Sequence, residues 1–138
     1  MHELSYFDIS NTKIFSDLPN FSNNCNLTDL PLYQTNIKTV NVSQCKQLTS
    51  VILNETPIKF FPNRYPENSF NFSVFPLLEY FITQKGSFEN TGLSLEFFCS
   101  QPNLIWLNLD KNSYTGIIPD CLKKLSNLKH LSFQTIIL

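Results

Sequence analysis

The sequence predicts an α/β solenoid, a coil of about six repeats whose strands form one curved parallel β-sheet. An apolar pattern, L-x-x-L-x-L with other apolar residues allowed, recurs at steps of 23, 21, 29, 27 and 24 residues. Positions downstream of this pattern keep the same phase from one copy to the next. Such steps match a known period of about 20 to 29 residues for stacked repeats.

The copies of the pattern extend over nearly the whole chain, which predicts a single domain over residues 1–138. Each copy starts at an apolar residue: Leu4, Leu27, Leu48, Leu77, Leu104 and Leu128. Eight residues after these starts lie Thr12, Thr35, Thr56, Lys85, Asn112 and Ile136. Ten residues after them lie Ile14, Ile37, Ile58 and Tyr114, and the fourth repeat slips by one, to Phe88. Matching positions at both offsets make a chance recurrence improbable.

Each repeat is expected to contribute one short strand, because its apolar residues alternate with a period of two. The strands should be parallel, since each turn of the coil returns in the same direction through a crossover of a dozen or more residues. The first, fourth and sixth positions of the pattern point inward. One repeat cannot bury its own apolar face, so three or more must stack.

The eighth position after each start needs a side chain that hydrogen-bonds backbone groups where the chain leaves the strand. Buried groups left unpaired there would cost about 1–3 kcal/mol each. Asn112 suits this position best, and the Thr hydroxyls are weaker substitutes. Lys85 should not lie inside, so the fourth repeat is expected to bulge there.

The side opposite the sheet is expected to be irregular in most repeats. Residues 119–128 carry apolar side chains at helical spacing, which predicts one or two helical turns there. Residues 63–76 supply the extra length of the 29-residue step and are expected to protrude as a loop insertion.

One segment, LIWLNLDKNSYTGIIPDCLKKLSNL at 104–128, resembles a leucine-rich repeat of the plant-type extracellular, receptor-like subclass. Asn112, Gly116, Ile118 and Pro119 carry its N-x-x-x-G-x-I-P signature. The resemblance to the leucine-rich repeat family extends over nearly the whole chain. It implies a right-handed coil with a mostly irregular convex side. It also implies that the concave face of the sheet carries the ligand, through the outward residues between the leucines.

Outward positions lie two, four and six residues after each start. The candidate partner-binding residues are Tyr6, Asp29, Tyr33, Ile52, Glu79, Phe81, Trp106, Asn108, Asp110 and His130. Ile52, Phe81 and Trp106 would form an apolar cluster on adjacent strands, rimmed by acidic residues, as in a protein-binding hot spot. The alternative is that a loop or missing flanking repeats cover these residues. Pro31 cannot donate to a strand ladder, so strand pairing should be weaker there.

Composition argues against several other functions. The chain has 10 basic and 11 acidic residues and a formal net charge of −1, so no electrostatic footprint for nucleic acid or an anionic membrane is present. No apolar stretch approaches the ~18 residues of a membrane span, and no direct membrane insertion is expected. His2 and His130 should lie at opposite ends of the coil, and no glycine-rich phosphate loop occurs. We therefore expect no metal, no cofactor and no enzymatic activity.

The four cysteines, Cys25, Cys45, Cys99 and Cys121, show no C-x-x-C spacing, so a zinc site is not expected. Cys25 and Cys45 lie one turn of the coil apart and could form a disulfide, whereas Cys99 and Cys121 are less well matched. The favoured alternative is that all four are small buried residues without disulfides.

Five N-x-S/T triplets favour a secreted or cell-surface parent protein; they start at Asn20, Asn26, Asn41, Asn54 and Asn71. A glycan on Asn54 would interfere with binding on the concave face. Either this site is unmodified, or the face does not bind, or the parent protein is cytosolic.

Both ends of the repeat array lack polar caps, so we expect the chain to be part of a larger protein. The favoured function is a non-catalytic recognition module of a cell-surface or receptor-like protein that binds a protein or peptide ligand. One alternative is an intracellular leucine-rich-repeat scaffold or adaptor without disulfides or glycans. Another is a structural spacer that uses no face for binding.

Overall fold

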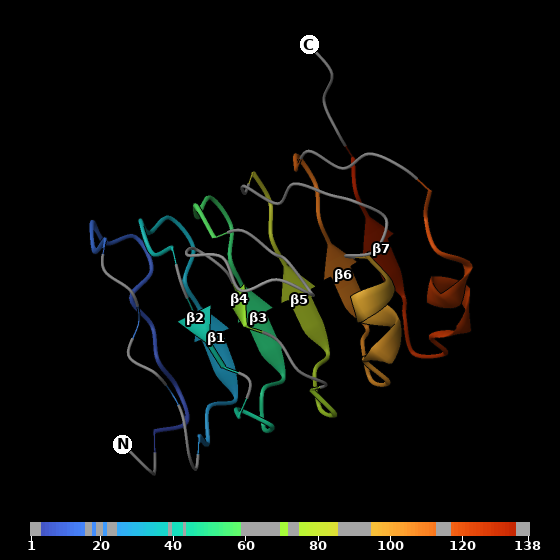
Figure 1. The fold of residues 1–138 in the computed structure, drawn as a ribbon, viewed down its shortest axis with the longest axis horizontal. Helices are drawn as coiled ribbons and strands as arrows, with labels where there is room; N and C mark the ends of the chain where they lie inside the picture. The colour runs from blue at the N-terminus through green and yellow to red at the C-terminus, as the bar shows by residue number, and fades with distance from the viewer. Residues whose placement is uncertain are drawn as a thin grey trace.

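The main element of the structure is a parallel β-sheet of five short strands. The computed structural model describes residues 4–15, 18, 21, 25–38, 40–42, 44–58, 70–71, 75–85, 95–112 and 117–134. The strands stand side by side in the order β1-β3-β5-β6-β7 (Figure 1). They are β1 (Asp29–Pro31), β3 (Ser50–Ile52), β5 (Tyr80–Ile82), β6 (Trp106–Asn108) and β7 (His130–Ser132). The prediction of one parallel sheet is therefore confirmed.

The middle residue of every strand points into the core, and the five middle residues form one column. Strand pairing aligns Leu30 with Val51, Phe81, Leu107 and Leu131. The first four of these side chains are completely buried, whereas Leu131 on the edge strand β7 is 38% exposed. Because side chains alternate between the two faces of a strand, this column places the residues on either side of it on the opposite face.

The fourth repeat starts at Leu78, one residue later than predicted. Leu78 is completely buried whereas Leu77 is 41% exposed, and the amide of Leu78 donates to the carbonyl of Phe75. The same four-residue turn precedes the other starts at Leu48, Leu104 and Leu128. The adjacent leucines allow two phases by sequence pattern, and only one of them brings Phe81 into the interior column.

In the first five repeats a residue with left-handed backbone lies seven positions after the start of the repeat. These residues are Asn11, Gln34, Glu55, Lys85 and Lys111, with φ between 51° and 59°. Lys85 thus occupies the same exposed turn as its counterparts, and the bulge predicted there is not found. The prediction was wrong because it placed Lys85 at the eighth position instead of the seventh.

The first repeat contributes an isolated bridge, between Tyr6 and Asp29, and no extended strand among the described residues. Pro31 lacks the N–H that would extend the ladder towards this repeat. On the other side of β1 the ladder continues, since the amide of Leu32 donates to the carbonyl of Ile52 at 2.8 Å. The predicted weakening of strand pairing at Pro31 is confirmed.

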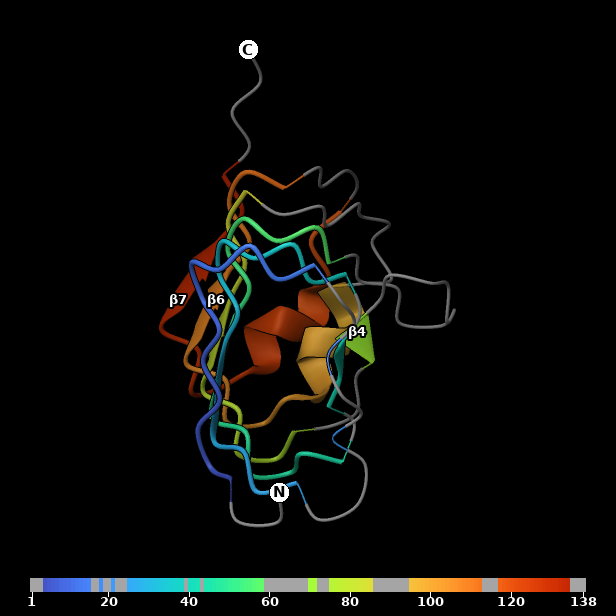
Figure 2. The same cartoon turned by 90° about the vertical axis from the view of Figure 1, so that its left-hand side faces the viewer.

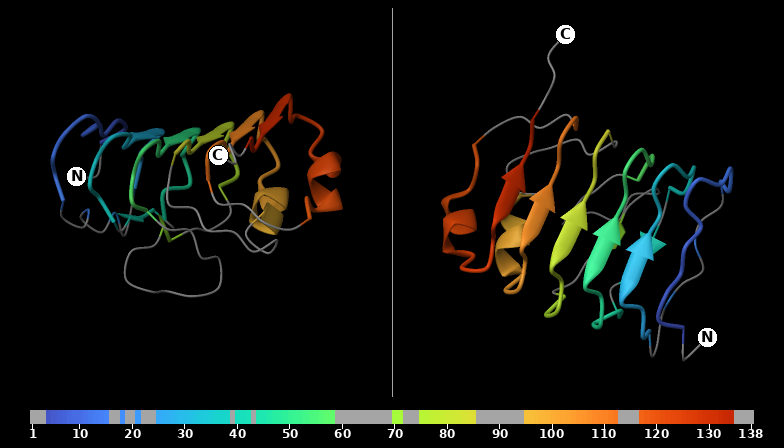
Figure 3. Two further views of the ribbon diagram at one scale, coloured as in Figure 1. Left: turned by 90° about the horizontal axis from the view of Figure 1, so that it is seen from above. Right: turned by 180° about the vertical axis from the view of Figure 1, so that it is seen from behind.

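All other regular elements lie on one side of the main sheet and form a second layer (Figures 2 and 3). Two strands, β2 (Val40–Asn41) and β4 (Phe70–Asn71), pair in parallel there. Two short 3₁₀ helices, η1 (Phe97–Ser100) and η2 (Asp120–Lys124), lie beside each other farther along the chain. The helical turn predicted within 119–128 corresponds to η2.

The predicted loop insertion at 63–76 needs a correction where the structure describes it. Phe70–Asn71 forms β4 in the second layer, and the side chain of Phe75 is completely buried. The remaining residues of this segment, apart from Pro76, lie outside the described part of the chain. The alternation of Phe with polar residues here allows a strand, and Phe75 anchors the end of the segment in the core.

The side chain eight residues after a start bonds the backbone, as predicted. The hydroxyls of Thr12, Thr35 and Thr56 donate to the carbonyl three residues earlier at 2.7–2.9 Å. Asn112 donates to the equivalent carbonyl of Leu109 at 2.9 Å and also to Thr83 in the preceding repeat at 2.6 Å. The side-chain amide of Asn112 therefore links two repeats, whereas each Thr hydroxyl bonds a carbonyl of its own repeat.

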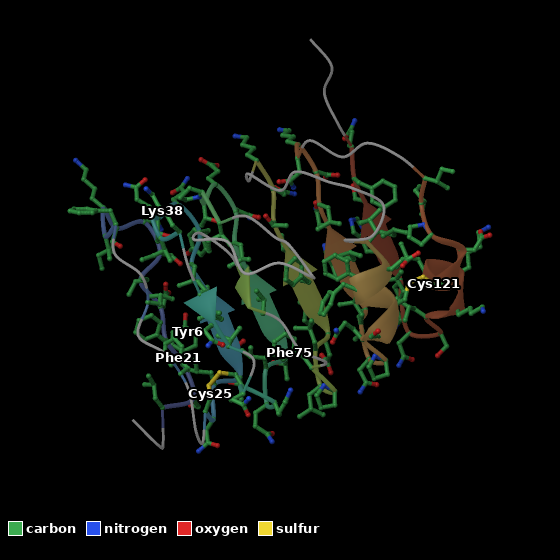
Figure 4. All side chains as sticks on the ribbon, in the orientation of Figure 1. Tyr6, Phe21, Cys25, Lys38, Phe75 and Cys121 are labelled. Atoms are coloured by element: carbon green, nitrogen blue, oxygen red, sulfur yellow. A yellow bond between two sulfur atoms is a disulfide. The ribbon has the colours of Figure 1, made fainter. Side chains whose placement is uncertain are left out.

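Two disulfides join consecutive repeats, which corrects the expectation of four unpaired cysteines. Cys25 pairs with Cys45, and Cys99 pairs with Cys121. Cys25 and Cys121 lie at opposite ends of the row of strands (Figure 4). Sequence spacing did not predict the second pair, because η1 and η2 bring Cys99 and Cys121 together in space.

Two Thr-to-Val substitutions should have opposite effects on stability. Thr83 occupies an interior position that other repeats fill with apolar residues. Its side chain is completely buried, and its hydroxyl has no partner among the described residues. Thr83→Val should therefore raise the free energy of unfolding by about 1 kcal/mol, because it removes an unpaired buried hydroxyl.

Thr35→Val is the matched control, since the equally buried hydroxyl of Thr35 donates to the Leu32 carbonyl at 2.9 Å. This substitution leaves that carbonyl unpaired and should lower the free energy of unfolding by about 1–2 kcal/mol. Urea unfolding of both variants under oxidising conditions measures the difference. A loss of stability in Thr83→Val as large as that in Thr35→Val would show that the Thr83 hydroxyl is satisfied.

Candidate functional site on the outer face of the sheet

The face of the main sheet that points away from the second layer is the candidate site, and we call it the outer face. Figure 3 shows the second-layer elements on the other side of the strands. Three side chains from each repeat belong to the outer face, at two, four and six positions after its start. In the corrected register they are Tyr6, Asp8, Ser10, Asp29, Pro31, Tyr33, Ser50, Ile52, Asn54, Tyr80, Ile82, Gln84, Trp106, Asn108, Asp110, His130, Ser132 and Gln134.

An aromatic row lies on the outer face of the last three strands. Strand register places Tyr80 beside Trp106 and Trp106 beside His130. The rings of Trp106 and His130 stack with their centroids 3.8 Å apart and their planes 13° from parallel. Tyr80 and Trp106 remain 39% and 37% exposed. Large aromatic side chains held in fixed orientations and partly exposed are well suited to contact a partner.

A less exposed row runs next to the aromatic row. Ile52 pairs with Ile82 across β3 and β5, and both side chains are half-buried. At the ends of this pair, Pro31 and Asn108 are buried. The centre of the outer face is therefore apolar, with the exposed aromatic rings along one side of it.

The first two repeats make one end of the outer face acidic. The Tyr6 hydroxyl donates to Asp8 at 3.1 Å, and the amide of Ser10 donates to the same carboxylate at 2.8 Å. The hydrogen bond that the backbone amide of Ser10 donates lowers the pKa of the Asp8 carboxyl. The hydrogen bond to Asp8, followed by desolvation and the charges of Asp8, Tyr33 and Asp29, raises the pKa of Tyr6. These four side chains therefore lie close enough to interact electrostatically.

Polar side chains six positions after the repeat starts accept hydrogen bonds from backbone amides of the next repeat. Asn54 Oδ1 accepts from the amide of Gln84 at 2.7 Å. Asp110 Oδ1 accepts from the amide of Gln134 at 2.6 Å and from the hydroxyl of Ser132. Each of these acceptors connects one repeat to the next. Asp110 therefore lies on the outer face and also links its repeat to the residues at the end of β7.

Eight of the ten sequence-predicted site residues lie on the outer face, and two do not. The prediction that Phe81 faces outward was wrong, because Phe81 is completely buried in the interior column. Glu79 lies one position before the outward residue Tyr80 and is not part of the face. Both errors follow from the fourth repeat starting at Leu78. The eight that share the face are Tyr6, Asp29, Tyr33, Ile52, Trp106, Asn108, Asp110 and His130.

The same shift explains the residues that the prediction missed, Tyr80, Ile82 and Gln84. The sequence contained one signal for the correct phase. Ten residues after Leu77 the pattern fails, whereas Phe88 lies ten residues after Leu78. In the corrected register Tyr80 takes the place that the prediction gave to Phe81. The outer face therefore still has an aromatic ring beside Trp106, and this ring carries a hydroxyl.

A groove of about 360 Å³ lies between η2 and β7, at the end of the core next to the last strand. Its walls are mostly apolar and include Leu125, Leu128 and Leu131, with Lys123 and Lys129 beside them. Leu128 and Leu131 occupy positions that point into the core in the other repeats, and His130 of the outer face also borders the groove.

Within the part of the chain that the structure describes, no three His, Cys, Asp or Glu side chains are grouped as metal ligands. In the same residues no helix has the length and apolar character that a bilayer span requires. Comparison with models of known protein families, with curated proteins and with solved structures finds no match to this chain.

The hydrogen bond between Tyr6 and Asp8 predicts a specific titration. Since the folded pKa of Tyr6 is raised, its stabilising contribution is present below the ordinary tyrosine pKa of about 10 and is lost as the pH rises through the folded value. Asp8→Ala should move the Tyr6 pKa down towards its ordinary value. The difference in absorbance at 295 nm between the chain and its Tyr6→Phe variant isolates this titration.

Glu96→Ala is the control, because Glu96 is an exposed carboxylate outside the outer face. It should leave the Tyr6 titration unchanged. An unshifted Tyr6 titration in Asp8→Ala would contradict the proposed link between these two side chains.

Proposed function

We propose that this chain is a section of a leucine-rich-repeat solenoid and acts as a non-catalytic recognition module. In this proposal a protein or peptide partner binds to the outer face, which is the concave face of the curved sheet. The module belongs to a larger cell-surface or receptor-like protein. The resemblance of residues 104–128 to a plant-type extracellular repeat supports the family assignment.

The regular repetition of local structure supports the solenoid. Five strands pair in one parallel register around a single interior column. A left-handed residue occupies the seventh position after the start of five repeats, and a backbone-bonding side chain occupies the eighth position of four. A set of stacked repeats requires this recurrence, because each repeat uses its neighbour to bury the same face.

The observation that carries the binding function is the exposure of large aromatic side chains on an otherwise regular sheet face. Tyr80 and Trp106 are both more than one-third exposed although they lie on central strands. Tyr and Trp are enriched among the residues that dominate the binding energy of interfaces. A structural spacer has no need for exposed aromatic rings in the middle of its sheet.

The chemistry of the carboxylates favours a non-catalytic role. Asp8 and Asp110 each accept hydrogen bonds from backbone amides, and the pKa of Asp8 is lowered as a result. A general base or acid works best with a pKa near the operating pH. The Asp8 carboxylate is therefore better suited to give the surface a negative charge than to transfer protons.

The two disulfides favour the extracellular alternative over an intracellular scaffold. Disulfides persist in oxidising compartments and are rare in the cytosol. Asn54 lies in an N-x-S/T triplet on the outer face, and its side-chain oxygen is held by the Gln84 amide. We propose that Asn54 remains unmodified, which keeps the face open in a protein that passes through a glycosylating compartment.

Peptide selection tests the binding function. A random peptide library displayed on phage is selected against the chain, and enriched peptides are re-measured by fluorescence anisotropy. A Tyr80→Ala/Trp106→Ala double variant should bind them at least about tenfold more weakly, equivalent to a loss of about 1.4 kcal/mol. The loss is expected because both exposed rings would leave the interface.

The matched control is Phe15→Ala/Ile117→Ala. It removes two other exposed apolar side chains, 80% and 86% exposed, that lie outside the outer face. It should change the dissociation constants less than about twofold. If the two double variants lose affinity equally, or if neither does, the outer face is not the binding surface.

Peptide mapping tests the proposed compartment. Protein taken from its native cells is alkylated without reduction, digested and analysed by mass spectrometry. Linked peptides containing Cys25–Cys45 and Cys99–Cys121 are expected, with Asn54 unglycosylated. Alkylated cysteines at all four positions would favour the intracellular scaffold instead.

A further inference from the structure

We infer that the partner of the outer face is a cationic extended peptide whose arginine or lysine side chains contact the acidic end and the aromatic row. This inference rests on the proposed function and specifies the chemistry of the ligand. It comes from the uneven distribution of charge between the outer face and the rest of the chain. The nearly neutral overall composition does not reveal this distribution. It also uses the position of Tyr80 and Trp106 on the same face as three carboxylates.

Charge is segregated between the outer face and the rest of the chain, although the formal net charge is only −1. The outer face carries the three carboxylates of Asp8, Asp29 and Asp110, and none of its positions is Lys or Arg. Elsewhere the described residues include eight lysines, all exposed, and four carboxylates. The outer face is therefore negative, and the rest of the described surface is positive.

The carboxylates of the outer face are not neutralised by the ion pairs found in the structure. In the described residues these pairs join Lys85 to Glu55 at 3.7 Å and Lys123 to Asp120 at 2.6 Å, both outside the outer face. Asp29 accepts a bond from the neutral hydroxyl of Thr28 at 2.7 Å. Three like charges on one face repel one another, and a cationic ligand removes that repulsion.

The aromatic row favours cations as well. Tyr80 and the face of Trp106 that is not stacked on His130 attract a guanidinium or ammonium group placed over the ring, and Trp gives the strongest attraction of this kind. Arginine is the better match, because its planar group stacks on aromatic rings and also forms two parallel bonds with a carboxylate. An acidic ligand would meet repulsion from the carboxylates and would gain nothing from the ring faces.

Strand spacing sets the expected distance between the cations of the ligand. Neighbouring strands lie about 4.8 Å apart, so Asp29 on β1 and Trp106 on β6 are separated by three intervals, or about 14 Å. An extended peptide advances about 3.3 Å per residue, which places two cationic residues about four positions apart. The whole row from Tyr6 to His130 then accommodates about seven residues.

Trp106 is the single tryptophan of the chain, so its fluorescence reports occupancy of the site. The probe is a blocked heptapeptide with arginine at its second and sixth positions and serine elsewhere. Two matched peptides carry citrulline or glutamate in place of arginine. The arginine peptide should change Trp106 emission saturably, and the citrulline and glutamate peptides should bind at least about tenfold more weakly.

Two variants test the contribution of the carboxylates. Asp29→Asn should weaken binding of the arginine peptide about three- to tenfold, because it removes one charge and preserves the size of the side chain. Glu96→Gln removes an exposed carboxylate outside the outer face and should change binding less than about twofold. The affinity of the unmodified chain should also fall as salt increases, a measurement that does not depend on the folding of any variant.

Equal binding of the arginine and citrulline peptides, or binding that is insensitive to salt, would overturn the inference. It would also be overturned if library selection yields neutral or acidic peptides that still require Tyr80 and Trp106, and in that case the proposed function stands. Selected peptides that do not require these two residues contradict the proposed function itself.

Discussion

The structure depends on one constraint, the burial of a single column of apolar side chains by parallel strands. Leu30, Val51, Phe81 and Leu107 lie in register and are completely buried. Because side chains alternate along a strand, a shift of one residue would exchange the interior and outer faces. The position of this column therefore decides which residues can contact a partner.

Hydrogen bonds from side chains to the backbone allow successive repeats to stack along this column. The Thr and Asn side chains at the eighth positions satisfy buried carbonyls, and Asn112 does so in two repeats at once. On the outer face, Asn54 and Asp110 satisfy the amides of the next repeat. Some residues of the candidate site thus also hold neighbouring repeats in register, which limits how freely the surface can vary.

The proposed recognition function and the proposed ligand chemistry arise from the same geometry. A repeated unit places equivalent positions in rows, so a preference for one type of residue at a position recurs on every strand of the sheet. Here the outward positions contain no Lys or Arg in any repeat, while the lysines of the described residues are exposed and lie outside the outer face. The result is a negative, partly aromatic face on a nearly neutral chain, and the disulfides join repeats at both ends of this face.

The repeating leucine pattern by itself determined the parallel sheet, the interior positions of Leu30, Val51 and Leu107, and most of the outer face. These features depend on local periodicity, which the order of residues records directly. Tertiary structure decided between Leu77 and Leu78, because both are apolar and a single downstream residue, Phe88, was the sequence signal for the later start. It also decided the pairing of Cys99 with Cys121 and the strand at Phe70–Asn71, since these contacts join segments whose separation in sequence carries no periodic signal.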